Sequence, residues 1–195
     1  IDNEMIYKQF QLLSLHGQNK DALAKTKLGA WEYDIIAPNF KCNMTDIMAG
    51  IGLAQFERYP KLLARRREII NMYNRALGVE DGSCYGEVNG HKIQVLNNYT
   101  DEQSSRGQLY LVGLMDRDME FRNEAINKMA ERGIACNVHY KPLPMMTAYK
   151  NLGFDIKDYP NAYNQFVNEI TLPLHTRLSD EDVEYIIENL VDTIG

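Results

Sequence analysis

The chain has 195 residues, of which 45% are apolar, and a formal net charge of −6. This length suits one ordinary domain or two small ones, and the apolar share is enough for a sizeable core. The negative charge argues against a nucleic-acid binder, which usually carries a clustered basic face. No apolar run approaches the roughly twenty residues of a membrane span. Three cysteines without CxxC spacing, and no zinc-ligand set, fit a reduced, cytoplasmic protein without a metal site.

The first predicted helix runs from about Asn3 to Leu15, and Gly17 is placed to end it. His16 lies at its C-terminus, where the helix dipole favours a protonated imidazole; a simple capping contact is the alternative. The chain starts without methionine and enters this helical pattern directly. We therefore expect it to be part of a longer protein.

A strongly apolar helix is predicted from Thr45 to about Arg58. It carries too many apolar side chains to face water, so we expect it to be buried. The start of a buried helix presents unpaired N–H groups and a partial positive charge, to which Lys41 adds a full charge. A phosphate or carboxylate could therefore bind there. The alternative is that Asn43 simply caps the helix.

A second helix is predicted to start at Pro60, because proline does not fit a helix interior, and to run to Leu77. Gly78 is placed to close it. We predict a domain boundary there, between residues 1–77 and residues 78–195. The following stretch, up to Arg106, is rich in Gly, Asn, Asp and Ser, and is expected to hold short strands at best.

Strands alternate with helices in the second part of the chain. Strands are predicted at residues 109–114, 134–140 and 169–172, and the first is apolar on both faces, as expected inside a sheet. Helices are predicted after Asp116 or Asp118, at residues 147–152 and 160–167, and after Ser179. This order predicts an α/β fold, a small sandwich with helices on one face of a sheet.

Several different short motifs are distributed along nearly the whole chain, apart from an insert-like stretch around residues 81–102. They are His16-Gly17, Phe40-Lys41-Cys42-Asn43-Met44-Thr45-Asp46-Ile47, Arg65-Arg66-Arg67-Glu68-Ile69, Leu109-Tyr110, Val138-His139-Tyr140-Lys141-Pro142-Leu143 and Leu172-Pro173-Leu174-His175. In this order they resemble the C-terminal half of the DegT/DnrJ/EryC1/StrS sugar aminotransferases.

The resemblance implies the C-terminal part of a fold-type-I pyridoxal-phosphate (PLP) transferase. Residues 1–77 would end the large cofactor domain, and residues 78–195 would form the small α/β domain. The family implies a homodimer with a shared active site, which moves an amino group from glutamate to a nucleotide-linked keto-sugar for polysaccharide synthesis. Its Schiff-base lysine lies shortly upstream of the His-Gly motif, and no lysine here matches it. Because transamination needs that amine, the chain alone is expected to be inactive.

The resemblance also implies cofactor-binding residues. The segment from Lys41 to Asn43 matches one that reaches across the dimer to the neighbouring subunit's cofactor phosphate or to the substrate, which favours the anion interpretation. Many members have Asn at the first of these positions and Arg at the second. Either Lys41 or Asn43 could therefore contact the phosphate.

Substrate-binding residues are predicted at His139, Tyr140 and His16. The first two match family residues that approach the nucleotide sugar, where an imidazole and a phenol can donate hydrogen bonds to phosphate or sugar oxygens. Judged without the resemblance, His139 is a surface or capped histidine. Gln108 stands where many members carry a histidine, which points to a different substrate preference.

Two other functions stay open. One is a sugar dehydratase of the same family, in which the lysine is replaced. The other is a non-catalytic binding or dimerisation module. If half of the protein lies outside this chain, we expect the first helices to expose apolar surface.

Overall fold

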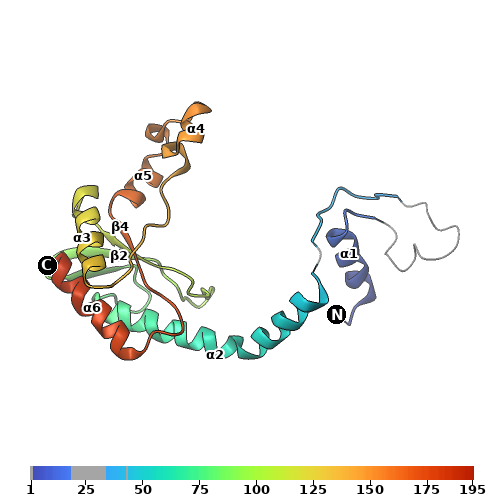
Figure 1. The fold of residues 1–195 in the computed structure, drawn as a ribbon, viewed down its shortest axis with the longest axis horizontal. Coiled ribbons are helices and arrows are strands. Elements are labelled where there is room, and N and C mark those ends of the chain that lie inside the picture. Colours follow the sequence, from blue (N-terminus) through green and yellow to red (C-terminus); the bar gives the residue numbers. More distant parts are fainter. Residues whose placement is uncertain (1, 19–33, 43) are drawn as a thin grey trace. The chain divides into compact units, whose positions relative to one another are not determined.

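The computed structural model describes residues 2–18, 34–42 and 44–195. Its elements, with η for a 3-10 helix, are α1 (Glu4–Ser14), α2 (Asp46–Ala76), β1 (Tyr85–Val88), β2 (His91–Val95), β3 (Tyr110–Leu114), α3 (Met119–Glu131), η2 (Leu143–Met145), α4 (Thr147–Asn151), η3 (Ile156–Asp158), α5 (Pro160–Val167), β4 (Glu169–Leu172) and α6 (Asp180–Ile194) (Figure 1). This mixture of helices and strands confirms the predicted α/β fold class.

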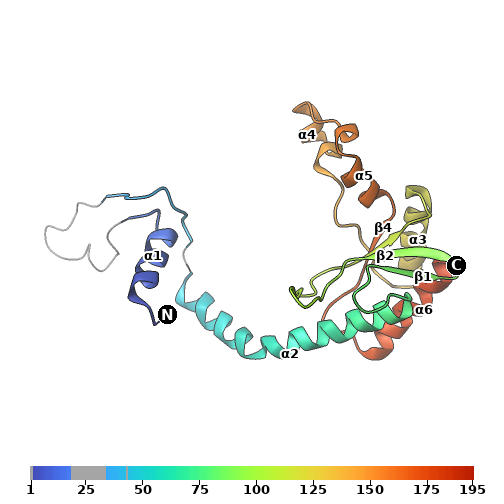
Figure 2. The ribbon, with the colours of Figure 1, turned by 180° about the vertical axis from the view of Figure 1, so that it is seen from behind.

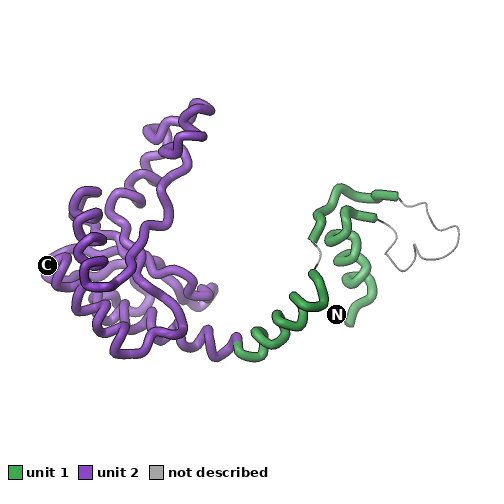
Figure 3. The backbone as a smooth tube through the Cα atoms, viewed as in Figure 1, with its two compact units in different colours: residues 1–58 green, residues 59–195 purple. Residues whose placement is uncertain are grey.

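The chain divides into two compact units, residues 1–58 and residues 59–195 (Figure 3). This division follows from which residues lie close together in space and does not locate the end of a cofactor domain. The functional boundary between residues 1–77 and residues 78–195 stays a prediction.

The first unit contains α1 and the first part of α2. The side chain of Asn3 caps α1, because its Oδ1 accepts hydrogen bonds from the N–H groups of Met5 at 3.0 Å and Ile6 at 3.2 Å. Both helices expose many large apolar side chains, among them Met5, Ile6, Tyr7, Phe10, Leu13, Ile47, Met48, Ile51, Leu53 and Phe56. The prediction of a buried helix after residue 45 is therefore wrong for this chain, and the expected exposure of apolar surface is confirmed.

Helix α2 is continuous and contains Pro60, so the prediction of a new helix at that residue is wrong. Proline lacks an N–H group and leaves the carbonyl of Phe56 without its helical partner. Phe56 is 74% exposed, so this stretch of α2 lies at the surface, where water can reach an unpaired carbonyl and lower the cost of the proline. Further along α2, Ile69, Ile70 and Tyr73 are fully buried and hold the helix in the second unit.

A four-stranded antiparallel sheet forms the centre of the second unit, in the order β1-β2-β3-β4. The pairs Tyr85–Gln94, Ile93–Leu114 and Tyr110–Leu172 fix the register of neighbouring strands. The predicted interior strand is β3, which lies between β2 and β4. The strand predicted at residues 169–172 is β4, and both predictions are confirmed.

Helices α3 and α6 lie on the same face of this sheet, in front of it in Figure 1 and behind it in Figure 2. They bury Ala125 and Met129 of α3, and Val183, Ile186 and Leu190 of α6. The predicted caps are confirmed: Asp118 accepts a hydrogen bond from the N–H of Phe121, and Ser179 and Asp182 form a capping box on α6. A membrane-crossing helix is absent from the part of the chain that the structure describes.

Candidate functional site

The turn at His16 and Gly17 follows α1, and the backbone at the end of α1 pairs with the segment that precedes α2. The backbone N–H of His16 donates to the carbonyl of Phe40 at 2.8 Å, and the N–H of Cys42 donates to the carbonyl of Ser14 at 2.9 Å. Leu15 and Lys41 form an antiparallel bridge. The backbone around Lys41 is therefore held beside the end of α1.

Gly17 is required in this turn for two reasons. Its φ angle is +75°, in the left-handed region that suits glycine. A Cβ at this position would lie 2.0 Å from the carbonyl oxygen of Ala37. Any other residue would have to displace the segment that carries Lys41.

The predicted cofactor-binding residues lie next to the start of α2. Lys41 is exposed. Asn43 lies outside the described residues. Among the described residues the cap of α2 is Thr45, whose Oγ1 accepts from the N–H of Met48 at 3.3 Å. An exposed ammonium group ahead of a helix start is a donor set that fits a phosphate, although Asp46 places a carboxylate in the first turn of α2.

Residues 134–140 do not form the predicted strand. Asn137 makes an isolated bridge to Thr171, with N–H to carbonyl distances of 3.1 Å and 2.7 Å. Two residues later, the N–H of His139 donates to Oε2 of Glu169 at 2.9 Å instead of to a backbone carbonyl. This side-chain acceptor replaces the next sheet hydrogen bond, so the pairing with β4 ends there.

His139 and Tyr140 lie together at the end of this segment. Their rings pack edge to face, with 4.6 Å between the centroids. His139 is half-buried, and its Nδ1 lies 2.8 Å from Oγ1 of Thr171. Tyr140 is 72% exposed, so its hydroxyl is open to a ligand. His139 is therefore held by β4, while Tyr140 is free to contact another molecule.

Glu169 and Arg122 are charged residues buried beneath His139. Glu169 is 1% exposed and Arg122 is 2% exposed. The guanidinium Nη1 of Arg122 donates to the carbonyls of Phe166 at 2.9 Å and Glu169 at 3.2 Å. Burial raises the pKa of the Glu169 carboxyl, while hydrogen bonds from Thr171 and His139 and the charge of Arg122 oppose this shift.

Sequence reasoning missed these buried polar residues. Their signal was a glutamate and a threonine at alternate positions of a strand whose other residues, Ile170 and Leu172, are apolar. Residues at alternate positions share one face of a strand. A charged residue in a buried strand usually has a specific partner, and here the partners include His139.

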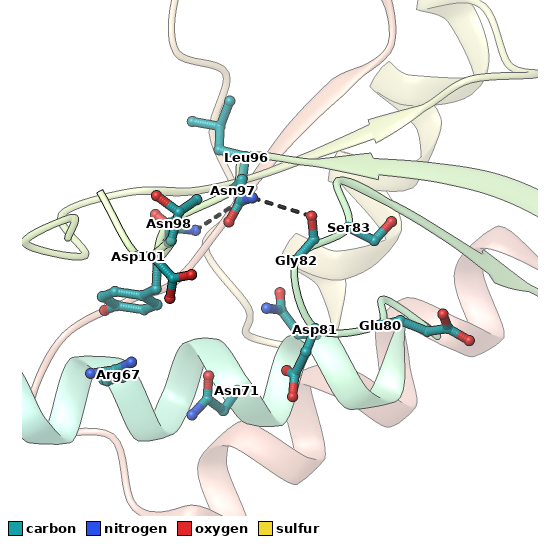
Figure 4. Close-up of a pocket in the computed structure, with 13 residues that line it drawn as sticks. Arg67, Asn71, Glu80, Asp81, Gly82, Ser83, Leu96, Asn97, Asn98 and Asp101 are labelled. Atoms are coloured by element: carbon teal, nitrogen blue, oxygen red, sulfur yellow. Dashed lines mark hydrogen bonds between the residues drawn. The ribbon is translucent and has the colours of Figure 1, made fainter. Parts of the chain in front are cut away.

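A polar cavity of about 610 Å³ lies in the second unit, between α2 and the loops at residues 80–83 and 96–101 (Figure 4). The guanidinium of Arg67 lies 4.5 Å from the centre of the Tyr99 ring. The amide of Asn97 donates to the carbonyl of Gly82 at 3.4 Å. The predicted residues His139 and Tyr140 do not line this cavity.

The predicted site residues fall in different units. His16 and Lys41 belong to the first unit and are brought together by the backbone ladder at the end of α1. His139 and Tyr140 belong to the second unit. Within the described ranges, no cluster of His, Cys, Asp and Glu could hold a metal ion.

The fold is that of the C-terminal part of a PLP-dependent aminotransferase. The chain is similar to the structure of a putative sugar aminotransferase, Spr1654 from Streptococcus pneumoniae, in its PMP form. That similarity has a TM-score of 0.76 and 54% sequence identity, and covers 100% of this chain and 46% of that chain. The PLP form of the same protein matches with a TM-score of 0.74.

The model of the DegT/DnrJ/EryC1/StrS aminotransferase family matches residues 1–191, and the chain belongs to this family. It is 30% identical to the spore coat polysaccharide biosynthesis protein SpsC of Bacillus subtilis, over 99% of this chain and 48% of SpsC. It is 26% identical to UDP-4-amino-4,6-dideoxy-N-acetyl-beta-L-altrosamine transaminase of Campylobacter jejuni, over 97% of this chain and 45% of that protein. The chain thus spans about half the length of these relatives. Aminotransferases of this family depend on PLP.

Proposed function

We propose that this chain is the C-terminal portion of a PLP-dependent aminotransferase that transfers an amino group from glutamate to a nucleotide-linked keto-sugar. The family match over residues 1–191 carries this proposal. The name of the Campylobacter jejuni relative, which specifies a transaminase and a UDP-linked amino sugar, supports the choice of substrate. The SpsC relative supports a role in polysaccharide synthesis.

The lysine that carries out the chemistry would lie upstream of this chain. No lysine here matches the family position ahead of His16-Gly17, so the chain alone would be inactive. Bound PLP would supply an electron sink for the carbon that exchanges its amino group. The residues of this chain would hold the cofactor and the sugar in place around that lysine.

Lys41 and Asn43 would bind the cofactor phosphate. Lys41 offers an exposed ammonium group, and its backbone is fixed by the ladder to α1. A fixed backbone lowers the entropy lost when the side chain binds an anion. Asn43 would add an amide donor from the same segment.

His139, Tyr140 and His16 would contact the sugar nucleotide. The exposed phenol of Tyr140 can donate a hydrogen bond to a phosphate or sugar oxygen, and its ring can pack on the sugar. The imidazole of His139 is held in one orientation by Thr171. His16 is exposed at the end of α1, beside the segment of Lys41.

The exposed apolar side chains of α1 and of the first part of α2 support a covering partner. Phe10 is 55% exposed, Ile47 is 78% exposed and Phe56 is 74% exposed. Exposed apolar groups on this scale mark an interaction surface. We assign this surface to the upstream half of the same protein and to a second subunit, as a homodimer. The reduced, cytoplasmic setting stays a prediction.

Spectroscopy and a product assay on the full-length protein test the function. Glutamate alone should convert the PLP form to the PMP form, which changes the absorbance of the cofactor. Addition of a UDP-linked keto-sugar should then restore the PLP form and yield an amino sugar. Residues 1–195 alone serve as the inactive control. If neither the half-reaction nor an amino sugar is observed, the proposal is wrong; loss of a hydroxyl group without amino transfer would indicate the dehydratase instead.

A further inference from the structure

The side chains of Glu169, Thr171 and His139 form a continuous hydrogen-bonded chain. Oγ1 of Thr171 is hydrogen-bonded to Oε1 of Glu169, and it lies 2.8 Å from Nδ1 of His139. Glu169 and Thr171 belong to β4, and His139 lies in the segment that bridges to it. These hydrogen bonds therefore connect the carboxylate of Glu169, a residue that is 1% exposed, to the half-buried imidazole of His139.

The proton positions in this chain follow from the chemistry of the hydroxyl group. Thr171 has a single O–H and can donate only one hydrogen bond. An ionised Glu169 can only accept, so the Thr171 hydroxyl donates to it. The contact between Thr171 and Nδ1 of His139 must then be donated by an Nδ1–H group. In a neutral imidazole this leaves Nε2 without a proton, as a hydrogen-bond acceptor.

Burial raises the pKa of Glu169, and three groups oppose that shift by stabilising the charged form. The backbone N–H of His139 donates to Oε2 at 2.9 Å, and the Thr171 hydroxyl donates to Oε1. The buried guanidinium of Arg122, on α3, supplies a positive charge that favours the carboxylate. Protonation of Glu169 would reverse the direction of these hydrogen bonds, because Thr171 would then accept from the carboxyl and donate to Nδ1 of His139.

We propose that Glu169 is a positioning residue for His139, which acts through Thr171 to keep the imidazole in the Nδ1–H tautomer with Nε2 as an acceptor. The ligand group that His139 recognises is then a hydrogen-bond donor, such as a sugar hydroxyl, and not an ionised phosphate oxygen, which can only accept. This assignment of the ligand rests on the proposed function. The tautomer itself depends only on the residues of the second unit.

The competing explanation is that Glu169 only holds the backbone of residues 137–140 in place. The two roles use different oxygens of the carboxylate, Oε2 for the His139 N–H and Oε1 for Thr171. Thr171→Val removes the hydroxyl at nearly constant shape and leaves the bond to the His139 N–H. Thr171→Ser keeps the hydroxyl and should rescue it.

The decisive experiment is NMR of the full-length protein with ¹⁵N-labelled histidine, with the His139 signals assigned by loss in His139→Gln. Wild type and Thr171→Ser should show a protonated Nδ1 and an unprotonated Nε2 at neutral pH. Thr171→Val should gain the Nε2–H tautomer. A protonated Nε2 and bare Nδ1 in the wild type would overturn the proposal whether or not any variant folds.

Kinetics provide a second measurement. Thr171→Val should raise the KM for the sugar nucleotide roughly tenfold, as expected for one hydrogen bond, with a smaller change in kcat. Thr176→Val makes the same chemical change at a hydroxyl for which the described residues provide no partner, and should leave KM unchanged. An unchanged KM in Thr171→Val would contradict the role in binding. Absence of amino transfer in the wild type would refute the proposed function, and the NMR result would still decide the tautomer.

Discussion

Gly17→Ala tests the turn that holds the proposed phosphate-binding segment. An alanine in left-handed backbone costs about 1 kcal/mol. Its Cβ would also lie 2.0 Å from the carbonyl oxygen of Ala37, so the segment around Lys41 must move. The N–H of Ile36 donates to the carbonyl of Gly17 at 3.0 Å, and loss of one such bond adds about 1 kcal/mol. The sum of about 2 kcal/mol corresponds to an opening constant roughly 30-fold larger.

Amide hydrogen exchange in the full-length protein measures this opening directly, in peptides that cover residues 12–18 and 34–42. The variant should exchange roughly 30-fold faster in both peptides and should bind PLP more weakly. Gly153→Ala is the matched control, because Gly153 has a φ of +92° but no atom within 4 Å of an added Cβ. It should cost about 1 kcal/mol near its own position and leave the two peptides unchanged. If Gly17→Ala also leaves their exchange unchanged, the described turn is wrong.

Three further predictions concern single side chains. Tyr73→Phe removes a buried hydroxyl that donates to a backbone carbonyl at 2.7 Å, and should lower the free energy of unfolding in urea by about 1 to 3 kcal/mol; an unchanged midpoint would contradict that bond. The hydrogen bond from His91 at 2.7 Å lowers the pKa of Asp116. The ionised carboxylate therefore stabilises the fold at pH values above its unfolded pKa, and this contribution is lost as the pH falls through the folded pKa. The Asp116→Asn variant should be less stable than wild type at pH 7, and the difference in stability should vanish in acid. Burial raises the pKa of the Cys136 thiol to about 11, so iodoacetamide at pH 8 should label the exposed Cys42 of residues 1–195 before it labels Cys136. Peptide mass spectrometry would measure the two labelling rates, and equal rates for Cys42 and Cys136 would refute this prediction.

The sequence predicted those elements whose signals are local. Ser179 and Asp182 are three residues apart, as a capping box requires, and α6 starts there. The all-apolar run of β3 correctly indicated an interior strand. In both cases the residues that determine the structure lie within a few positions of one another.

The errors arose where a local pattern is compatible with two structures and the surroundings decide between them. Pro60 suggested a helix start, but α2 continues through it in a stretch where Phe56 is 74% exposed and water can reach the backbone. Residues 134–140 alternate like a strand, but Glu169 takes the N–H of His139 out of the sheet. The contact between these two residues spans 30 positions, and no local pattern reveals it.

The candidate site was predicted only in part. The resemblance supplied His139, Tyr140, His16, Lys41 and Asn43, whose roles stay proposals. The supporting residues Thr171 and Glu169 make no contribution to any motif, because their role depends on pairing between segments. The polar cavity beside α2 was equally hidden, since its lining comes from three separate parts of the second unit.

Borohydride reduction of the full-length protein after addition of PLP tests the central claim most directly. Intact mass and peptide mapping would locate the reduced cofactor. We predict a single phosphopyridoxyl-lysine on a peptide upstream of residues 1–195, with no adduct on a lysine of this chain. A specific adduct on one of the lysines within residues 1–195, or no specific adduct at all, would contradict the assignment of this chain to the C-terminal part of a lysine-dependent aminotransferase.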